Sequence, residues 1–192
     1  MYNSDKRIVK TERLIKNTFI DLLTKKECSK ITIKEICNTA LISKSTFYDH
    51  YEDKYALLQT MINEYAEQFK LEVHKRLKLT STGNGNNALQ MINRITQSIS
   101  SHNEQLSVLL RESKGPNGLE SKLRNILISE SSAYLSTNHD NKKFSNEFLA
   151  KMYTEITLAS LSFALINYND PDLLQQQTQF IDIMQRTMLA NV

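Results

Sequence analysis

The chain has 192 residues, with four glycines, two prolines and no tryptophan. That composition is typical of a helical globular protein, and it argues against collagen-like, disordered and β-rich classes. The net charge is only +3, but the first 50 residues carry ten Lys/Arg against six Asp/Glu. We therefore expect any polyanionic partner at the N-terminal end, although a basic surface that is merely solvated fits the charge equally well.

Several function classes are excluded by what the sequence lacks. No apolar run approaches eighteen residues, and no apolar segment follows the charged N-terminus, so we expect a cytoplasmic protein that does not span a membrane. Cys28 and Cys37 are expected as two reduced thiols. The four histidines are scattered, and no Cys/His set has metal-ligand spacing, so we expect no metal and no cofactor.

Helical periodicity runs through nearly the whole chain. A first helix is expected over residues ~6–26, with an apolar stripe of Ile8, Leu14, Ile15, Phe19, Leu22 and Leu23. A second helix begins after Thr32, because Thr32 and Glu35 have the spacing of a capping box. It is expected to end near Thr39 and to bury Ile33, Ile36, Cys37 and Ala40.

Ser43 is expected to cap a third helix of about eight residues. Asp53 then opens a long fourth helix that ends near Lys78. Its inward side chains are Leu58, Ile62, Tyr65, Phe69, Val73 and Leu77.

The rest of the chain contains further breaks and caps. TSTGNGNN (80–87) is expected as a linker and SKGPNG (113–118) as a break between helices. Ser101–Glu104 and Asn117–Glu120 have capping-box spacing. Two long helices are expected over 144–168 and 171–189, the last with Asp170 as its cap and Pro171 at its first position.

The expected architecture is all-α. Three short helices form a helix-turn-helix head over residues 1–52. A larger helical bundle follows over residues 53–192, giving about nine helices in total.

The second and third helices are joined by a turn as short as that of a helix-turn-helix motif. Helical spacing turns Phe47 and Tyr51 inward. The outer face carries polar groups: Lys44, Ser45, Tyr48 and, less squarely, Asp49. Cations and hydroxyls suit a phosphodiester backbone, and DNA-reading helices place their N-terminal residues on base edges. The pattern indicates DNA binding, and a solvated pair of helices remains the open alternative.

The segment ITIKEICNTALISKSTFYDHYEDKYALL resembles the DNA-binding signature of the tetracycline-repressor (TetR)/AcrR family of bacterial transcription regulators. The resemblance covers roughly residues 8–60; beyond them, only length and helix count agree. It implies a regulator, commonly a repressor, that binds a palindromic operator in double-stranded DNA as a homodimer. By position, it implies DNA contacts for Thr32, Lys34, Lys44, Ser45, Thr46, Tyr48, His50 and Lys54.

These residues also have simpler roles open to them. Thr32 is a helix cap with or without DNA, and His50 and Lys54 fit an ordinary surface. Lys44 is the residue best suited to base readout, because a lysine can donate to guanine O6 or N7.

Two positions depart from the family pattern. The family's turn usually carries glycine where this chain has Leu41, and a non-glycine residue at positive φ is strained by about 1 kcal/mol or more. We therefore expect a slightly different turn. Asp49 brings a negative charge to the proposed DNA face, where it could accept from cytosine N4 or simply face water.

The resemblance also implies that the last two helices pair with those of a second copy. Two apolar stripes are compatible with this, and both also fit an internal core. The candidate interface residues are Phe148, Met152, Ile156, Phe163, Phe180 and Met184.

A small apolar effector between the fourth helix and the helices after it is the further implication. The candidate lining residues are Met61, Tyr65, Phe69, Met91 and Tyr153, because methionine and aromatic side chains suit an adaptable pocket. Plain core residues would look the same.

Three functions are therefore compared. The first is a ligand-released dimeric repressor. The second keeps the DNA-binding head but has a C-terminal domain that binds a protein partner, as a co-activator or architectural factor. The third, a helical enzyme, is not favoured, because the sequence shows no nucleophile–base set, no glycine-rich phosphate loop and no acidic metal cluster.

Overall fold

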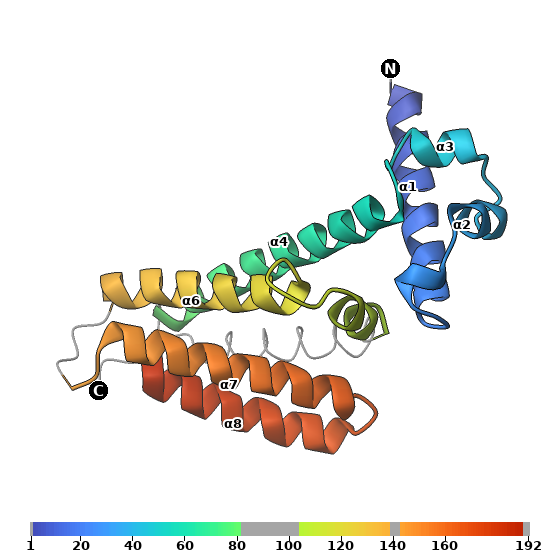
Figure 1. Ribbon diagram of the computed structural model, residues 1–192. Helices are drawn as coiled ribbons and strands as arrows, with labels where there is room; N and C mark the ends of the chain where they lie inside the picture. The colour runs from blue at the N-terminus through green and yellow to red at the C-terminus, as the bar shows by residue number, and fades with distance from the viewer. Residues whose placement is uncertain (1, 82–103, 139–142, 190–192) are drawn as a thin grey trace.

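A computed structural model describes residues 2–81, 104–138 and 143–189 (Figure 1). The regular elements in these ranges are all helical, which confirms the all-α class. They are α1 (Tyr2–Leu23), the 3₁₀ helix η1 (Cys28–Lys30), α2 (Ile33–Thr39), α3 (Lys44–Tyr48), α4 (Lys54–Ser81), α6 (Leu119–Asn138), α7 (Asn146–Ile166) and α8 (Pro171–Leu189), together with helical residues 104–112.

The head consists of α1, α2 and α3 around a small apolar core. Its centre is fully buried and comprises Ile15, Phe19, Leu23, Ile31, Ile36 and Phe47. The first helix is not short, since it has 22 residues. Two residues of its predicted stripe, Ile8 and Leu14, are 46% and 44% exposed. Ile8 lies near the N-terminal end of α1. Leu14 lies one residue, about 100° of helical rotation, from the buried Ile15.

The predicted helix starts are confirmed by their caps. Thr32 Oγ1 accepts from the amide of Glu35 at 3.2 Å, and Ser43 Oγ accepts from that of Thr46 at 3.0 Å. At the start of α4, Asp53 Oδ1 accepts from two amides, at 2.8 and 2.7 Å. Each cap satisfies backbone donors that have no partner within the helix.

The third helix is shorter than expected, with five residues. Its last turn tightens, because the amides of His50 and Tyr51 both bond to the carbonyl of Phe47. The chain then turns toward the cap of α4.

The long helix α4 leaves the head and packs along α6, while α7 packs between α6 and α8 (Figure 1). The predicted inward residues of α4 are buried or half-buried. The last two helices occur as predicted to within two residues, and Asp170 Oδ1 caps α8 by accepting from the amide of Leu173 at 2.9 Å. They lie antiparallel at the edge of the body farthest from α4 (Figure 1).

The break at 113–118 occurs where expected, but Asn117 does not cap α6. The cap is instead the buried Ser113, whose Oγ accepts from the amide of Leu119 at 3.0 Å. Gly118 makes this possible, since a Cβ there would lie 1.8 Å from the carbonyl oxygen of Ser113. Ser101, Met91 and most of the 80–87 segment lie outside the described residues.

One described helix, α7, is long and apolar enough to cross a membrane. A single such helix is weak evidence, because core helices of water-soluble proteins pass the same test. Tyr153 and Thr154 of α7 are almost completely buried in the body.

Candidate nucleic-acid interface

The inward side of α3 anchors this helix to the head as predicted. Phe47 is fully buried and Tyr51 is 7% exposed, with their ring centroids 5.9 Å apart. Burial, together with the negative charges of Glu12 and Glu64, raises the pKa of Tyr51 to about 12. Cys28 and Cys37 are buried free thiols, as expected, and burial raises the pKa of both. The position of α3 therefore depends on apolar packing.

The outward side of α3 exposes Lys44, Ser45, Tyr48 and Asp49. Tyr48 is 54% exposed, and its ring is braced edge-on against Phe47, with centroids 5.7 Å apart. This packing orients the phenol without burying it. Thr32 and Lys34, at the start of α2, are exposed too. The two helices thus present cations and hydroxyls, with Asp49 among them.

Three further residues predicted to contact DNA already have partners within the head. Thr46 Oγ1 lies 2.8 Å from Ser43 Oγ. His50 Nδ1 lies 3.6 Å from a carboxylate oxygen of Glu12, and its side chain is only 11% exposed. Lys54 Nζ donates to the carbonyl oxygens of Ser29 at 2.9 Å and Ile31 at 2.6 Å, which leaves one of its three ammonium hydrogens. These residues shape the head and have less freedom to reach a ligand.

The body contacts the head directly through two residues that the sequence interpretation missed. Arg111 donates to the carbonyl oxygen of Leu23 at the end of α1. Glu112 accepts from the amide of Cys28 at 2.8 Å, and its side chain is 8% exposed. Their place before the SKGPNG break was visible in the sequence, but nothing there indicated the partners.

Four of the five residues predicted to line an effector pocket lie inside the body. Met61 and Tyr153 are buried, and Tyr65 and Phe69 pack partly buried against the core. Burial raises the pKa of Tyr65 to about 12. Met91 is not among the described residues.

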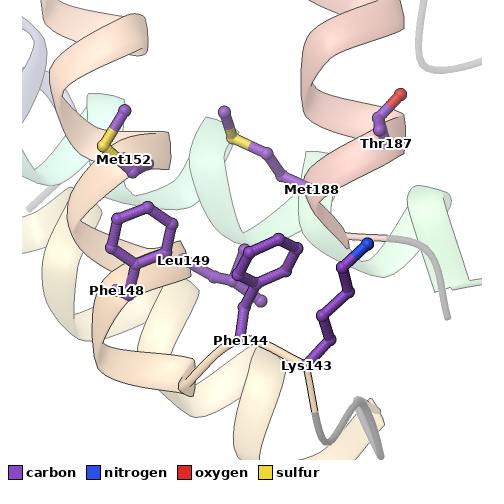
Figure 2. Close-up of a pocket in the computed structure, with 7 residues that line it drawn as sticks. All are labelled: Lys143, Phe144, Phe148, Leu149, Met152, Thr187 and Met188. Carbon is purple, nitrogen blue, oxygen red and sulfur yellow. The ribbon is translucent and has the colours of Figure 1, made fainter. Parts of the chain in front are cut away.

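Two apolar hollows lie elsewhere, on the surface shared by α7 and α8. One, of about 530 Å³, is lined by Lys143, Phe144, Phe148, Leu149, Met152, Thr187 and Met188 (Figure 2). The other, of about 430 Å³, includes Ile156, Phe163, Phe180 and Gln177. Neither is lined by the predicted effector residues.

The exposed apolar side chains of α7 and α8 include most of the predicted interface. Phe148, Met152, Phe163 and Phe180 are 37–60% exposed, and Ile156 and Met184 are half-buried. We call this set the α7–α8 face. Large exposed apolar patches on a protein surface mark contact sites.

Comparison with known proteins adds to these observations. No family model matches the chain. A segment of 59 residues, 30% of this chain, is 44% identical to an uncharacterized HTH-type transcriptional regulator, YxbF of Bacillus subtilis, but it spans only 16% of that protein.

Solved structures match over most of the chain. A TetR transcriptional regulator from Streptococcus agalactiae superposes with a TM-score of 0.58 at 22% identity, covering 93% of this chain and 97% of that one. The SmeT–triclosan complex gives 0.71 at 15% identity, covering 93% and 90%. The fatty acid degradation regulator FadR from Bacillus halodurans gives 0.68 at 11% identity, covering 95% and 97%.

The chain has the fold of the TetR-family regulators. The expected fold is thereby confirmed, from the helix-turn-helix head to the last two helices.

Leu41, in the turn before α3, stands where the resemblance to the TetR family leads us to expect glycine. Leu41 has φ of +54° and is 92% exposed. Leucine thus adopts the left-handed conformation itself, and the expected difference in the turn stays a prediction. Because its side chain contacts almost nothing, the strain has no compensating contact at this site.

Replacing Leu41 with glycine should raise the free energy of unfolding by about 0.5–1 kcal/mol, since relief of the left-handed strain exceeds the extra freedom of glycine in the unfolded chain. Urea denaturation measures the change. Leu41→Ala is the matched control, because alanine keeps the Cβ and should leave stability within about 0.5 kcal/mol. A glycine variant no more stable than the alanine variant contradicts this account.

Proposed function

We propose that the protein is a cytoplasmic transcription regulator that binds double-stranded DNA through α2 and α3. The observation that carries the proposal is the exposed face of Lys44, Ser45 and Tyr48 on a helix held to the head by the buried Phe47. The second helix of a helix-turn-helix enters the major groove of DNA. Its cation and two hydroxyls can bond to base edges there and to the flanking phosphates. The TetR fold and the regulator YxbF support the same function.

Within this face, the exposed residues have the larger roles. Lys44 donates to a base edge, and Tyr48 and Lys34 contact phosphates. Thr32 offers its hydroxyl beside them. Three residues make peripheral contacts with the DNA backbone: Thr46, His50 and Lys54. Their partners within the head limit how far these side chains reach.

The active form is a homodimer on a palindromic operator. Two α3 helices must meet half-sites about one helical turn apart, or a multiple of it. The α7–α8 face supplies an apolar contact surface for the second copy. A repressor then leaves its operator when the spacing of its two heads changes.

A small apolar effector would produce this change by binding more tightly to one spacing of the heads while DNA binds more tightly to the other. Its site lies among Met61, Tyr65, Phe69, Met91 and Tyr153. The SmeT structure contains triclosan, an example of a TetR-fold protein bound to a small molecule. The bonds of Arg111 and Glu112 to the head supply a route from body to head beside α4.

A second candidate keeps the DNA-binding head but assigns the body to a protein partner. It is favoured by the hollow of about 530 Å³ beside Phe144 and Phe148, which is an open apolar groove on the surface (Figure 2). In this version the regulator is a co-activator or an architectural factor. Neither version assigns an enzymatic reaction to the chain.

Substitutions of Lys44 and Tyr48 should change DNA binding in different ways. Lys44→Ala should lower discrimination at one base pair by about 1–3 kcal/mol, whereas Tyr48→Phe should weaken all sequences alike by about 1 kcal/mol. Fluorescence anisotropy on a duplex selected from a random pool, and on its single-base variants, measures both. Lys25→Ala is the control, because Lys25 is exposed and lies in the segment after α1, outside α2 and α3. If neither variant binds differently from this control, α3 does not contact the DNA.

A further inference from the structure

The turn between α2 and α3 is fixed by two backbone bonds. The amide of Ile42 donates to the carbonyl oxygen of Cys37 at 3.0 Å, and the amide of Leu41 donates to that of Asn38 at 3.4 Å. These bonds form a Schellman motif, in which the residue after the helix cap takes the left-handed conformation and is usually glycine. Because Ala40 is buried and Ile42 packs against the core, Leu41 is held at this position.

Leucine is an unfavourable residue at this position of the turn. Its φ of +54° brings the Cβ atom too close to the following carbonyl oxygen. The side chain is 92% exposed, so packing within the chain does not offset the strain. Residues kept in strained conformations cluster at active sites and at sites that hold a ligand. The strained and exposed Leu41 is therefore a candidate contact residue.

The sequence around Leu41 indicates the chemistry of its partner. Leu41 lies three residues before Lys44 and two before Ser43, the cap of α3. Among residues 24–53, all of which the structure describes, the exposed large apolar side chains are only Leu41 and Tyr48. A protein partner would need a contiguous apolar patch, and a single leucine in a polar segment does not form one. The major groove of DNA fits better, because thymine places one methyl group there among hydrogen-bonding groups.

We propose that Leu41 contacts the C5-methyl group of a thymine in each half-site of the operator. The proposal rests on the DNA binding of the proposed function and adds a specificity-determining residue to it. The Cα atoms of Leu41 and Lys44 are at most about 11 Å apart, three steps of about 3.8 Å. Base pairs follow one another at about 3.4 Å, so the thymine lies within about three base pairs of the pair that Lys44 reads. Because the turn already fixes Leu41, little backbone freedom is lost on contact.

The test replaces each thymine of a selected duplex in turn by uracil, which removes only the methyl group. Fluorescence anisotropy compares the wild type with Leu41→Ala, which keeps the Cβ atom but is too short to reach the methyl group. At one thymine per half-site, uracil should weaken wild-type binding about fourfold, the effect of burying one methyl group. The same replacement should leave the affinity of Leu41→Ala unchanged.

Two further variants separate this contact from an effect on folding. Leu41→Met keeps an apolar side chain of similar volume and should retain the preference for thymine over uracil. Leu41→Gly should lose the preference although it is the more stable protein, so that loss does not come from unfolding.

If uracil has the same effect on the wild type and on Leu41→Ala at every thymine, Leu41 contacts no methyl group and the proposal is overturned, while DNA binding stands. A wild-type protein that binds no duplex from the pool overturns the proposed function as well. The two failures are therefore distinguishable.

Discussion

Phe180→Arg is expected to make the protein monomeric at concentrations where the wild type is a dimer. Phe180 is 60% exposed on α8 and lines the hollow of about 430 Å³. In a dimer through the α7–α8 face, both copies would bury an unpaired guanidinium there, at a cost of about 4 kcal/mol or a factor of 10³ in dissociation constant. Sedimentation equilibrium measures the dissociation constant directly.

Phe180→Arg should weaken dimerisation without lowering the stability of one copy, because an exposed side chain contributes little to the fold of that copy. The thermal midpoint extrapolated to low concentration should therefore be unchanged. Leu71→Arg is the matched control: Leu71 is 58% exposed, but lies on α4. This control should remain a dimer. If the Phe180 variant dimerises as tightly as the control, the copies associate through another surface.

Phe47→Ala is expected to abolish DNA binding by unfolding the head. Phe47 is fully buried and packs against the rings of Tyr48 and Tyr51. Loss of its ring should cost about 3–5 kcal/mol, which is a large part of the stability of so small a unit. Hydrogen exchange should accelerate over residues 33–51 and stay slow in α6 and α7.

Phe47→Leu is the control for this variant. It keeps much of the buried volume and should cost about 1.5 kcal/mol or less, with binding retained. A Phe47→Ala protein that still binds DNA with wild-type affinity would show that packing under α3 does not position the DNA face.

Local features of the fold were predictable because they depend on neighbours in sequence. Three predicted caps begin the helices that follow them: Thr32, Ser43 and Asp53. In each case the side-chain oxygen accepts from the backbone amide three residues later. The spacing of Phe47 and Tyr51 correctly assigned the inward side of α3. The predicted length of α3 was wrong, because the end of this helix depends on where the chain must turn to enter α4.

Features that depend on distant residues were not predictable from one sequence. Glu112 bonds to Cys28, 84 residues away, and no local pattern specifies that partner. Lys54 was expected to face DNA, yet it bonds to the carbonyls around η1. In each case, a charged residue satisfies backbone groups whose position is known only from the packed head and body.

The apolar stripes of the last two helices were predictable only in part. Periodicity identified Phe148, Phe163 and Phe180, but it could not separate a core face from a contact face, since both require apolar side chains. Their exposure shows that these three side chains are not core residues of a single copy, and their place in a contact face stays a prediction.

Selection of bound duplexes from a random pool would show whether the protein binds DNA as a dimer. We expect enrichment of an inverted repeat whose half-sites lie about one helical turn apart, or a multiple of it. Affinity for the selected duplex should fall steeply with salt, by about 10³ or more between 50 and 200 mM if six or more phosphates are contacted. A pool that yields no repeat, or binding that salt does not weaken, contradicts a dimeric DNA-binding regulator.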